Sequence, residues 1–173
     1  MLLTLRTTRP PATDLASFLG RDPGRVESFE RPFGRIHVFY PEADETACTA
    51  ALLLDVETPG DGPSDRPYAA SPLLAEAVAW LIPEEGAGAG EEPMPLEAKI
   101  AALPCRGGEA SVRRRFEPLG YQVKTETHPL DPERPDLGPS PYLSVTLRGV
   151  CRVRDLLAHL SAGIAALNEE GAG

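Results

Sequence analysis

Residues 49–56 constrain the fold most strongly, because they form a nearly continuous apolar run, Thr-Ala-Ala-Leu-Leu-Leu-Asp-Val, bounded by turn residues. A short run of this composition is typical of a strand whose two faces are both buried. We therefore expect residues 49–56 to form a strand inside a sheet, with other parts of the protein packed on each of its faces.

Alternation of apolar and polar side chains predicts further strands. The most convincing alternations lie at residues 34–40 and 142–148. In the first of these, Ile36 and Val38 alternate with Arg35 and His37, so the strand should have one apolar and one polar face. Weaker patterns predict strands at residues 2–7, 26–29, 96–103 and 121–127.

Apolar side chains at three- and four-residue spacing predict four helices. Residues 71–82 begin with Ser71 and Pro72, which favour a helix start. Helices are also expected at 12–20 and 108–119. The strongest stripe lies in residues 152–168 and comprises Val153, Leu156, Leu157, Leu160, Ile164 and Leu167.

This order of elements predicts an α+β fold of mixed β-sheets with helices packed on them, and leaves open a division into two small lobes. Glycine and proline, at 16 and 19 residues, make up about a fifth of the chain, so long loops are expected. The acidic, glycine-rich stretch 84–95 favours a loop or linker. It would separate a first α+β lobe at 1–83 from a second at 96–168.

The chain has 26 acidic and 17 basic residues and a formal net charge of −9. Domains that bind the phosphate backbone broadly are normally basic, so this balance argues against that role and suits a basic protein partner. The cysteines at 48, 105 and 151 are odd in number and far apart. We therefore expect reduced thiols, no zinc site and a cytoplasmic protein. Since no apolar segment is long enough to span a bilayer, we expect no membrane partner.

The sequence Cys-Arg-Gly-Gly-Glu at 105–109 lies between a predicted strand and a predicted helix. Two interpretations stay open for Arg106, Gly107 and Gly108. The glycines could let the backbone approach an anion at a helix start, or they could serve an ordinary tight turn. Cys105 has no histidine base that the sequence can place beside it, so catalysis is not expected.

Four further residues could contact a partner. Arg35 and His37 share the polar face of the strand at 34–40, where they are either a contact surface or ordinary surface residues. Arg66 and Tyr68 precede the helix at 71–82. They are either exposed interface anchors or local packing residues, with Arg66 paired to Asp65.

Arginines supply the main argument for contact with RNA. Arg148, Arg152 and Arg154 are clustered in sequence around Gly149, and Arg113 and Arg114 point outward from the predicted helix at 108–119. They would form a positive patch only if the fold brought them together; otherwise they are solvated surface residues. The three histidines are dispersed without metal-ligand spacing, so no metal site is expected.

Three longer motifs carry a family resemblance: Phe-Gly-Arg-Ile-His-Val-Phe-Tyr-Pro-Glu-Ala at 33–43, Cys-Thr-Ala-Ala-Leu-Leu-Leu-Asp-Val at 48–56 and Leu-Pro-Cys-Arg-Gly-Gly-Glu at 103–109. Shorter matches continue in the same order to about residue 167. Together they resemble the amino-terminal region of the bacterial 3′-terminal RNA ribose 2′-O-methyltransferase.

The resemblance implies a non-catalytic chain that binds a bacterial polynucleotide kinase-phosphatase carrying an RNA ligase module and activates its adenylation step. It implies a hetero-oligomer that meets RNA indirectly, through the complex. In this family S-adenosylmethionine and a divalent metal are held by the carboxy-terminal half, so no cofactor is expected in this chain. Residues 169–173 would be a flexible end leading to that methyltransferase domain.

Two departures from the family limit these implications. The paired glutamates and histidines of the methyltransferase site are absent, and the loops at 58–65 and 83–92 are shorter than the family pattern. The competing hypothesis is an RNA-binding module that positions cleaved tRNA ends for repair and 2′-O-methylation. A free-standing enzyme is least supported, because no coherent catalytic set is present.

Overall fold

The computed structural model describes residues 1–56, 72–82, 92–105 and 107–169. These ranges contain four α-helices, two short 3-10 helices and seven strands. The helical segments are α1 (Asp14–Phe18), α2 (Pro72–Trp80), α3 (Gly108–Phe116), η1 (Glu117–Leu119), η2 (Pro135–Leu137) and α4 (Val153–Glu169). The strands are β1 (Leu2–Thr7), β2 (Glu27–Arg31), β3 (Gly34–Ala43), β4 (Cys48–Asp55), β5 (Met94–Pro104), β6 (Gln122–Pro129) and β7 (Pro139–Cys151).

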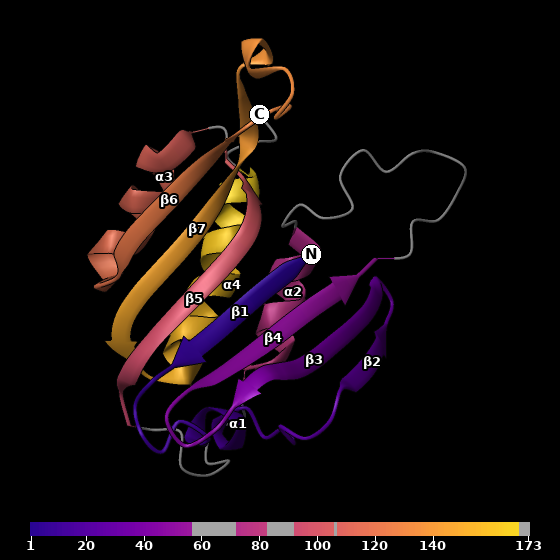
Figure 1. The fold of residues 1–173 in the computed structure, drawn as a ribbon, viewed down its shortest axis with the longest axis vertical. Helices are drawn as coiled ribbons and strands as arrows, with labels where there is room; N and C mark the ends of the chain where they lie inside the picture. The colour runs from indigo at the N-terminus through magenta and orange to yellow at the C-terminus, as the bar shows by residue number, and fades with distance from the viewer. Residues whose placement is uncertain (57–71, 83–91, 106, 170–173) are drawn as a thin grey trace.

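All seven strands belong to one sheet, in the order β2-β3-β4-β1-β5-β7-β6 (Figure 1). Every pairing among the described strands is antiparallel. The expected α+β class is confirmed, while the sheet is antiparallel throughout rather than mixed. Short connections such as the turn between β2 and β3 explain this, because they return the chain beside the strand it has just left.

The first strand joins the two parts of the chain. β1 pairs with β4 on one side and with β5 on the other, so strands from before and after the predicted linker share the sheet. Of the predicted linker at 84–95, residues 84–91 lie outside the described part, and Met94 and Pro95 already belong to β5.

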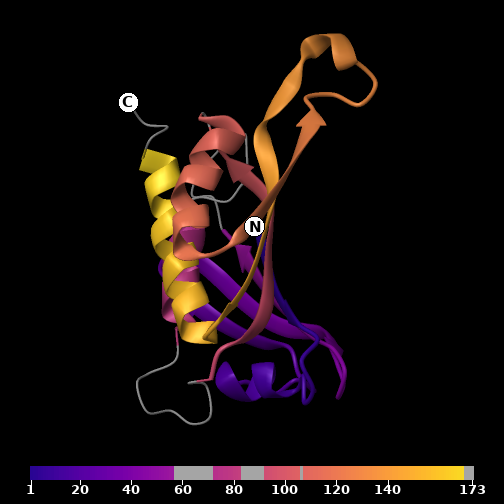
Figure 2. The ribbon, with the colours of Figure 1, turned by 90° about the vertical axis from the view of Figure 1, so that its left-hand side faces the viewer.

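Helices α2, α3 and α4 cover one face of the sheet, while α1 lies at one end of it (Figures 1 and 2). The buried core lies between this helical layer and the sheet, where it includes Leu5, Leu54, Ile100 and Val145 from the strands. The stripe predicted along residues 152–168 is confirmed, since its six apolar residues are at most 2% exposed. Among the described helices, none has the length and apolar character required to cross a bilayer.

β4 corrects the expectation of a strand buried on both faces. Leu52 and Leu54 are 3% and 1% exposed on the helix-covered side, whereas Leu53 is 38% exposed on the other side. Among the described residues, helices α2, α3 and α4 all lie on one face of the sheet, so the other face of this apolar strand is left without a helix on it (Figure 2).

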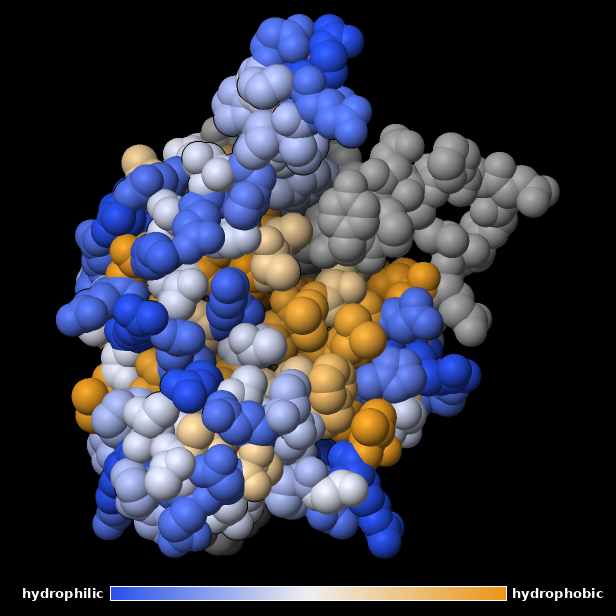
Figure 3. Space-filling model, viewed as in Figure 1, coloured by the Kyte–Doolittle hydropathy of each residue, from blue (hydrophilic) through white to orange (hydrophobic). Residues whose placement is uncertain are grey.

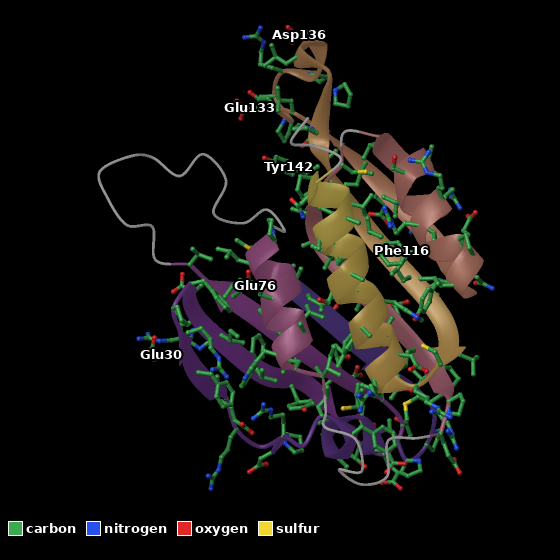
Figure 4. All side chains as sticks on the ribbon, turned by 180° about the vertical axis from the view of Figure 1, so that it is seen from behind. Glu30, Glu76, Phe116, Glu133, Asp136 and Tyr142 are labelled. Atoms are coloured by element: carbon green, nitrogen blue, oxygen red, sulfur yellow. The ribbon has the colours of Figure 1, made fainter. Side chains whose placement is uncertain are left out.

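The segment at 128–141 is the end of the long β6–β7 hairpin. It projects beyond the rest of the sheet as an arm and carries η2 near its tip (Figures 1 and 2). Glu133 and Asp136 mark this end of the molecule (Figure 4). Leu130 and Leu137 are exposed there, so the arm adds little to the core.

Candidate protein-interaction surface

The described helices α2, α3 and α4 leave one side of the sheet uncovered, and we call this side the open face (Figure 2). Cross-strand register decides which side chains share it. One row contains Ser28, His37, Leu53 and Leu2, and a second contains Phe39, Ala51, Thr4, Lys99, Thr146 and Lys124. A third contains Arg6, Thr49, Glu97, Arg148 and Gln122.

The middle of the open face is apolar. Leu2 and Leu53 are directly opposed on β1 and β4 and are 37% and 38% exposed. Phe39, half-buried on β3, lies opposite Ala51. Figure 3 shows hydrophobic side chains gathered over this part of the sheet. We call Leu2, Phe39, Ala51 and Leu53 the apolar centre.

Charged side chains surround the apolar centre in balanced numbers. The strands place five basic residues on the open face (Arg6, Arg35, Lys99, Lys124 and Arg148) and five acidic ones (Glu30, Glu42, Asp55, Glu97 and Glu126). Four of the five basic side chains are ion-paired on the face itself, in the pairs Arg6–Glu42, Arg35–Glu30, Lys124–Glu126 and Arg148–Glu97. The described part of this face therefore offers little unbalanced positive charge.

A groove of about 600 Å³ crosses one end of the open face. Its walls include Arg6, Glu97, Gln122, Arg148 and Val150, from four adjacent strands. Arg148 Nε donates to Glu97 Oε2 at 2.6 Å across the groove wall. Because the pair is exposed, it orients the two side chains more than it stabilises the fold. The groove mixes polar and apolar walls and holds no described set of groups suited to bond-making.

The structure brings three of the residues singled out in the sequence onto the open face. Arg35, His37 and Arg148 lie there, and His37 Nδ1 is hydrogen-bonded to Ser28 Oγ at 2.8 Å. Arg152 lies between β7 and α4 and is exposed. Arg66, Tyr68 and Arg106 lie outside the described residues. A partner-binding role for each of these positions stays a prediction.

Gly107 and Gly108 form the turn that starts α3. Gly108 has φ +61, and a side chain at Gly107 would collide with Ser111, whose Cβ would lie 2.8 Å from the new Cβ. The Gly108 N–H donates to the Cys105 carbonyl at 3.1 Å, which closes the turn. This geometry supports the tight-turn interpretation, because it accounts for both glycines without a bound anion.

The arginines of the RNA hypothesis are divided between two sides of the sheet. Arg113 lies on α3, on the helix-covered side, and pairs with both Glu109 and Glu117. Glu117 and Glu109 accordingly raise the pKa of the Arg113 guanidinium. Arg148 lies on the open face, paired with Glu97. Arg113 and Arg148 therefore do not share one positive patch.

Tyr121, His159 and Cys151 form a polar contact under α4. The Tyr121 hydroxyl is hydrogen-bonded to His159 Nδ1 at 2.8 Å and donates to Cys151 Sγ at 3.7 Å. Burial raises the pKa of the Tyr121 hydroxyl and of the Cys151 thiol, so both are neutral near pH 7. A neutral, inward-facing thiol is a poor nucleophile, and the contact is structural. No three His, Cys, Asp or Glu side chains in the described ranges are grouped as a metal site requires.

Sequence reasoning missed the apolar centre. Its signal was present in residues 49–56, whose apolar character on both faces was interpreted as burial within the chain. An apolar strand face is compatible equally with burial inside the fold and with burial against another protein. The pattern alone cannot distinguish the two.

Comparison with solved structures shows that this fold is similar to that of chains in structures of an RNA repair complex. One match lies in the structure of the Pnkp1/Rnl/Hen1 RNA repair complex, with 13% identity and a TM-score of 0.63 over 97% of this chain and 42% of that one. Another lies in a structure of the Pnkp1/Rnl/Hen1 complex, with 13% identity and a TM-score of 0.61 over 94% and 41%. At this identity the likeness shows the fold. The chain spans about two fifths of the length of these relatives.

A comparison with curated proteins found no match to the chain. Among protein families, residues 1–171 match the model described as "RNA repair, ligase-Pnkp-associating, region of Hen1". The match spans almost the whole sequence, including the motifs at 33–43, 48–56 and 103–109 on which the resemblance was based. The chain therefore belongs to the family of ligase-Pnkp-associating regions of Hen1.

Proposed function

We propose that this chain binds a bacterial polynucleotide kinase-phosphatase that carries an RNA ligase module, and that binding activates the ligase's adenylation step. The family description supports the association, and the fold similarity to chains of Pnkp1/Rnl/Hen1 complexes agrees with it. The observation that carries the proposal in this chain is the charge pairing on the open face. A face on which four of the five basic groups are ion-paired and acidic groups are equally numerous is suited better to a protein than to a phosphate backbone.

Activation needs no catalytic group in this chain. A partner that exists in competent and incompetent conformations shifts toward whichever the activator binds more tightly. A 100-fold preference corresponds to about 2.7 kcal/mol of differential binding free energy, which one modest interface can supply. We further propose that any sites for S-adenosylmethionine and a divalent metal belong to another part of the protein than residues 1–173.

Ligase adenylation in the presence and absence of this chain tests the proposal. The purified ligase–Pnkp protein from the same organism should transfer AMP from ATP to its own ligase module at least about tenfold faster when the 173-residue chain is present at a concentration above its dissociation constant. A tenfold increase requires only about 1.4 kcal/mol of differential binding free energy. Unchanged adenylation, together with separate elution on gel filtration, would refute both activation and association.

Salt dependence separates this function from the RNA-binding alternative. A protein interface built around apolar contacts should weaken by less than about tenfold between 50 and 200 mM salt, whereas contact with six or more phosphates would cost about a thousandfold or more over the same range. Titration calorimetry with the partner, and gel shift with a cleaved tRNA stem, measure the two slopes. Tight, strongly salt-dependent binding of the isolated chain to the stem would favour the RNA-binding module instead.

A further inference from the structure

The apolar centre lies on interior strands of the sheet. β4 is hydrogen-bonded to β3 and β1, and β1 is hydrogen-bonded to β4 and β5. Their backbone N–H and C=O groups are therefore already used in the sheet. A partner cannot bind here by adding a strand, because that mode requires a free sheet edge. It must bind through side chains packed flat against the face.

The side chains that the apolar centre exposes allow such packing. Ala51 is small and only 2% exposed, and it lies opposite the larger Phe39 of β3 and two residues before Leu53, which faces Leu2 of β1. Ala51 is thus covered by its neighbours, and the accessible apolar surface of the centre belongs to Leu2, Leu53 and the half-buried Phe39. Complementary apolar side chains from a helix or a second sheet could pack on these exposed side chains at ordinary sheet-packing distance, about 10 Å between layers.

The charges around the apolar centre indicate what kind of molecule fits. The ion pairs Arg35–Glu30 and Arg6–Glu42 lie on either side of it, so the rim is polar and electrically balanced. An apolar core with a polar, balanced rim is the ordinary anatomy of a protein–protein interface. A nucleic acid would instead require an excess of unpaired cations at the rim, which the described part of the open face lacks.

From these observations we infer that the ligase–Pnkp partner covers the apolar centre of the open face with an apolar side-chain surface, with Leu53 at the middle of the contact. This inference rests on the proposed function, because it names the surface through which that function would operate. It also explains why the strand at 48–55 is apolar on both faces: one face is buried within the chain, and the other is buried in the complex.

Leucine substitutions with a matched control test the inference. Leu53→Asp and the milder Leu53→Thr, which keeps a strand-forming residue, should each weaken binding of the 173-residue chain to the purified ligase–Pnkp protein about tenfold or more in titration calorimetry. The control is Leu119→Asp. Leu119 is 47% exposed at the end of η1, which leads into β6, the edge strand that is three strands away from β1, and its substitution should leave affinity within about twofold, as usual for a residue outside the centre of an interface.

The outcomes separate the inference from the proposed function. If the wild-type chain fails to bind the partner, the proposed function fails and the contact surface fails with it. If the wild type binds and both Leu53 variants, folded by circular dichroism, bind equally well, the inference alone is overturned. It is also overturned if light scattering shows a wild-type dimer that Leu53→Thr dissociates while partner binding is unchanged, because a second copy would then occupy the face. Competition by cleaved tRNA for the Leu53 surface would likewise contradict it.

Discussion

Replacing Phe116 with alanine is expected to lower the free energy of unfolding by about 3–5 kcal/mol, the range for deleting a buried aromatic ring. The Phe116 side chain is completely buried between α3 and α4 (Figure 4). Its ring contacts the backbone of α4 at Gly163, where an added Cβ would lie 2.7 Å from Phe116 Cε1. The edge of Tyr121 meets the same ring, with 6.4 Å between centroids. Urea denaturation followed by circular dichroism measures the change.

The contact with Gly163 can be separated from simple burial. Gly163→Ala places a methyl group against a ring that has no room to move, and should cost about 1–3 kcal/mol despite alanine's better helix propensity. Phe116→Leu frees space beside residue 163, so the double variant should be more stable than the sum of the two single changes predicts. Strict additivity would show that the two residues do not constrain each other. Leu119→Ala, at an exposed position, is the control and should change stability by less than about 0.5 kcal/mol.

Replacing Gly34 with alanine is the second large expected effect, a loss of about 2–4 kcal/mol from backbone strain together with steric conflict. Gly34 opens β3 with φ +140, a conformation that side chains disfavour. A Cβ there would collide with the carbonyl oxygen of Asp55 and lie 3.0 Å from Val56 Cα. Both obstacles are backbone atoms at the end of β4, so the strain cannot be relieved by a rotamer change.

Gly138→Ala is the matched control for Gly34→Ala. Gly138 also has a positive φ, at +85, but an added Cβ would meet nothing within 4 Å. It should therefore cost only the strain, roughly 1–2 kcal/mol. Thermal and urea unfolding of the two variants compare them directly. Equal losses would mean that the steric conflict with β4 contributes nothing, contrary to the geometry.

Most of the elements could be predicted from the sequence, because their signals are local. The helices at 71–82 and 152–168 are confirmed in their described parts, as α2 and α4. The strand at 2–7 agrees residue for residue with β1. Differences occur mainly at the ends: β7 begins at Pro139, because the arm continues the hairpin past the point where alternation is recognisable.

The open face was only partly predictable. Alternation in residues 34–40 correctly placed Arg35 and His37 together on the polar side of a strand, and the register brings both onto the open face. Leu2 and Leu53 were not predicted as surface residues, because an apolar side chain in a strand carries no local mark of what covers it. The sequence also did not determine that Arg113 and Arg148 lie on different sides of the sheet, because that depends on how distant elements pack.

By itself, the sequence determined the kinds of elements, their order, the apolar stripe of α4 and the family motifs, because each of these depends on neighbours a few residues away. The tertiary structure decided that β1 lies between β4 and β5 and that α2, α3 and α4 cover the same face of the sheet. Those choices depend on contacts between distant segments, whose energies no local pattern records. They leave one side of an apolar strand without a helix on it, which the pattern of that strand alone could not show.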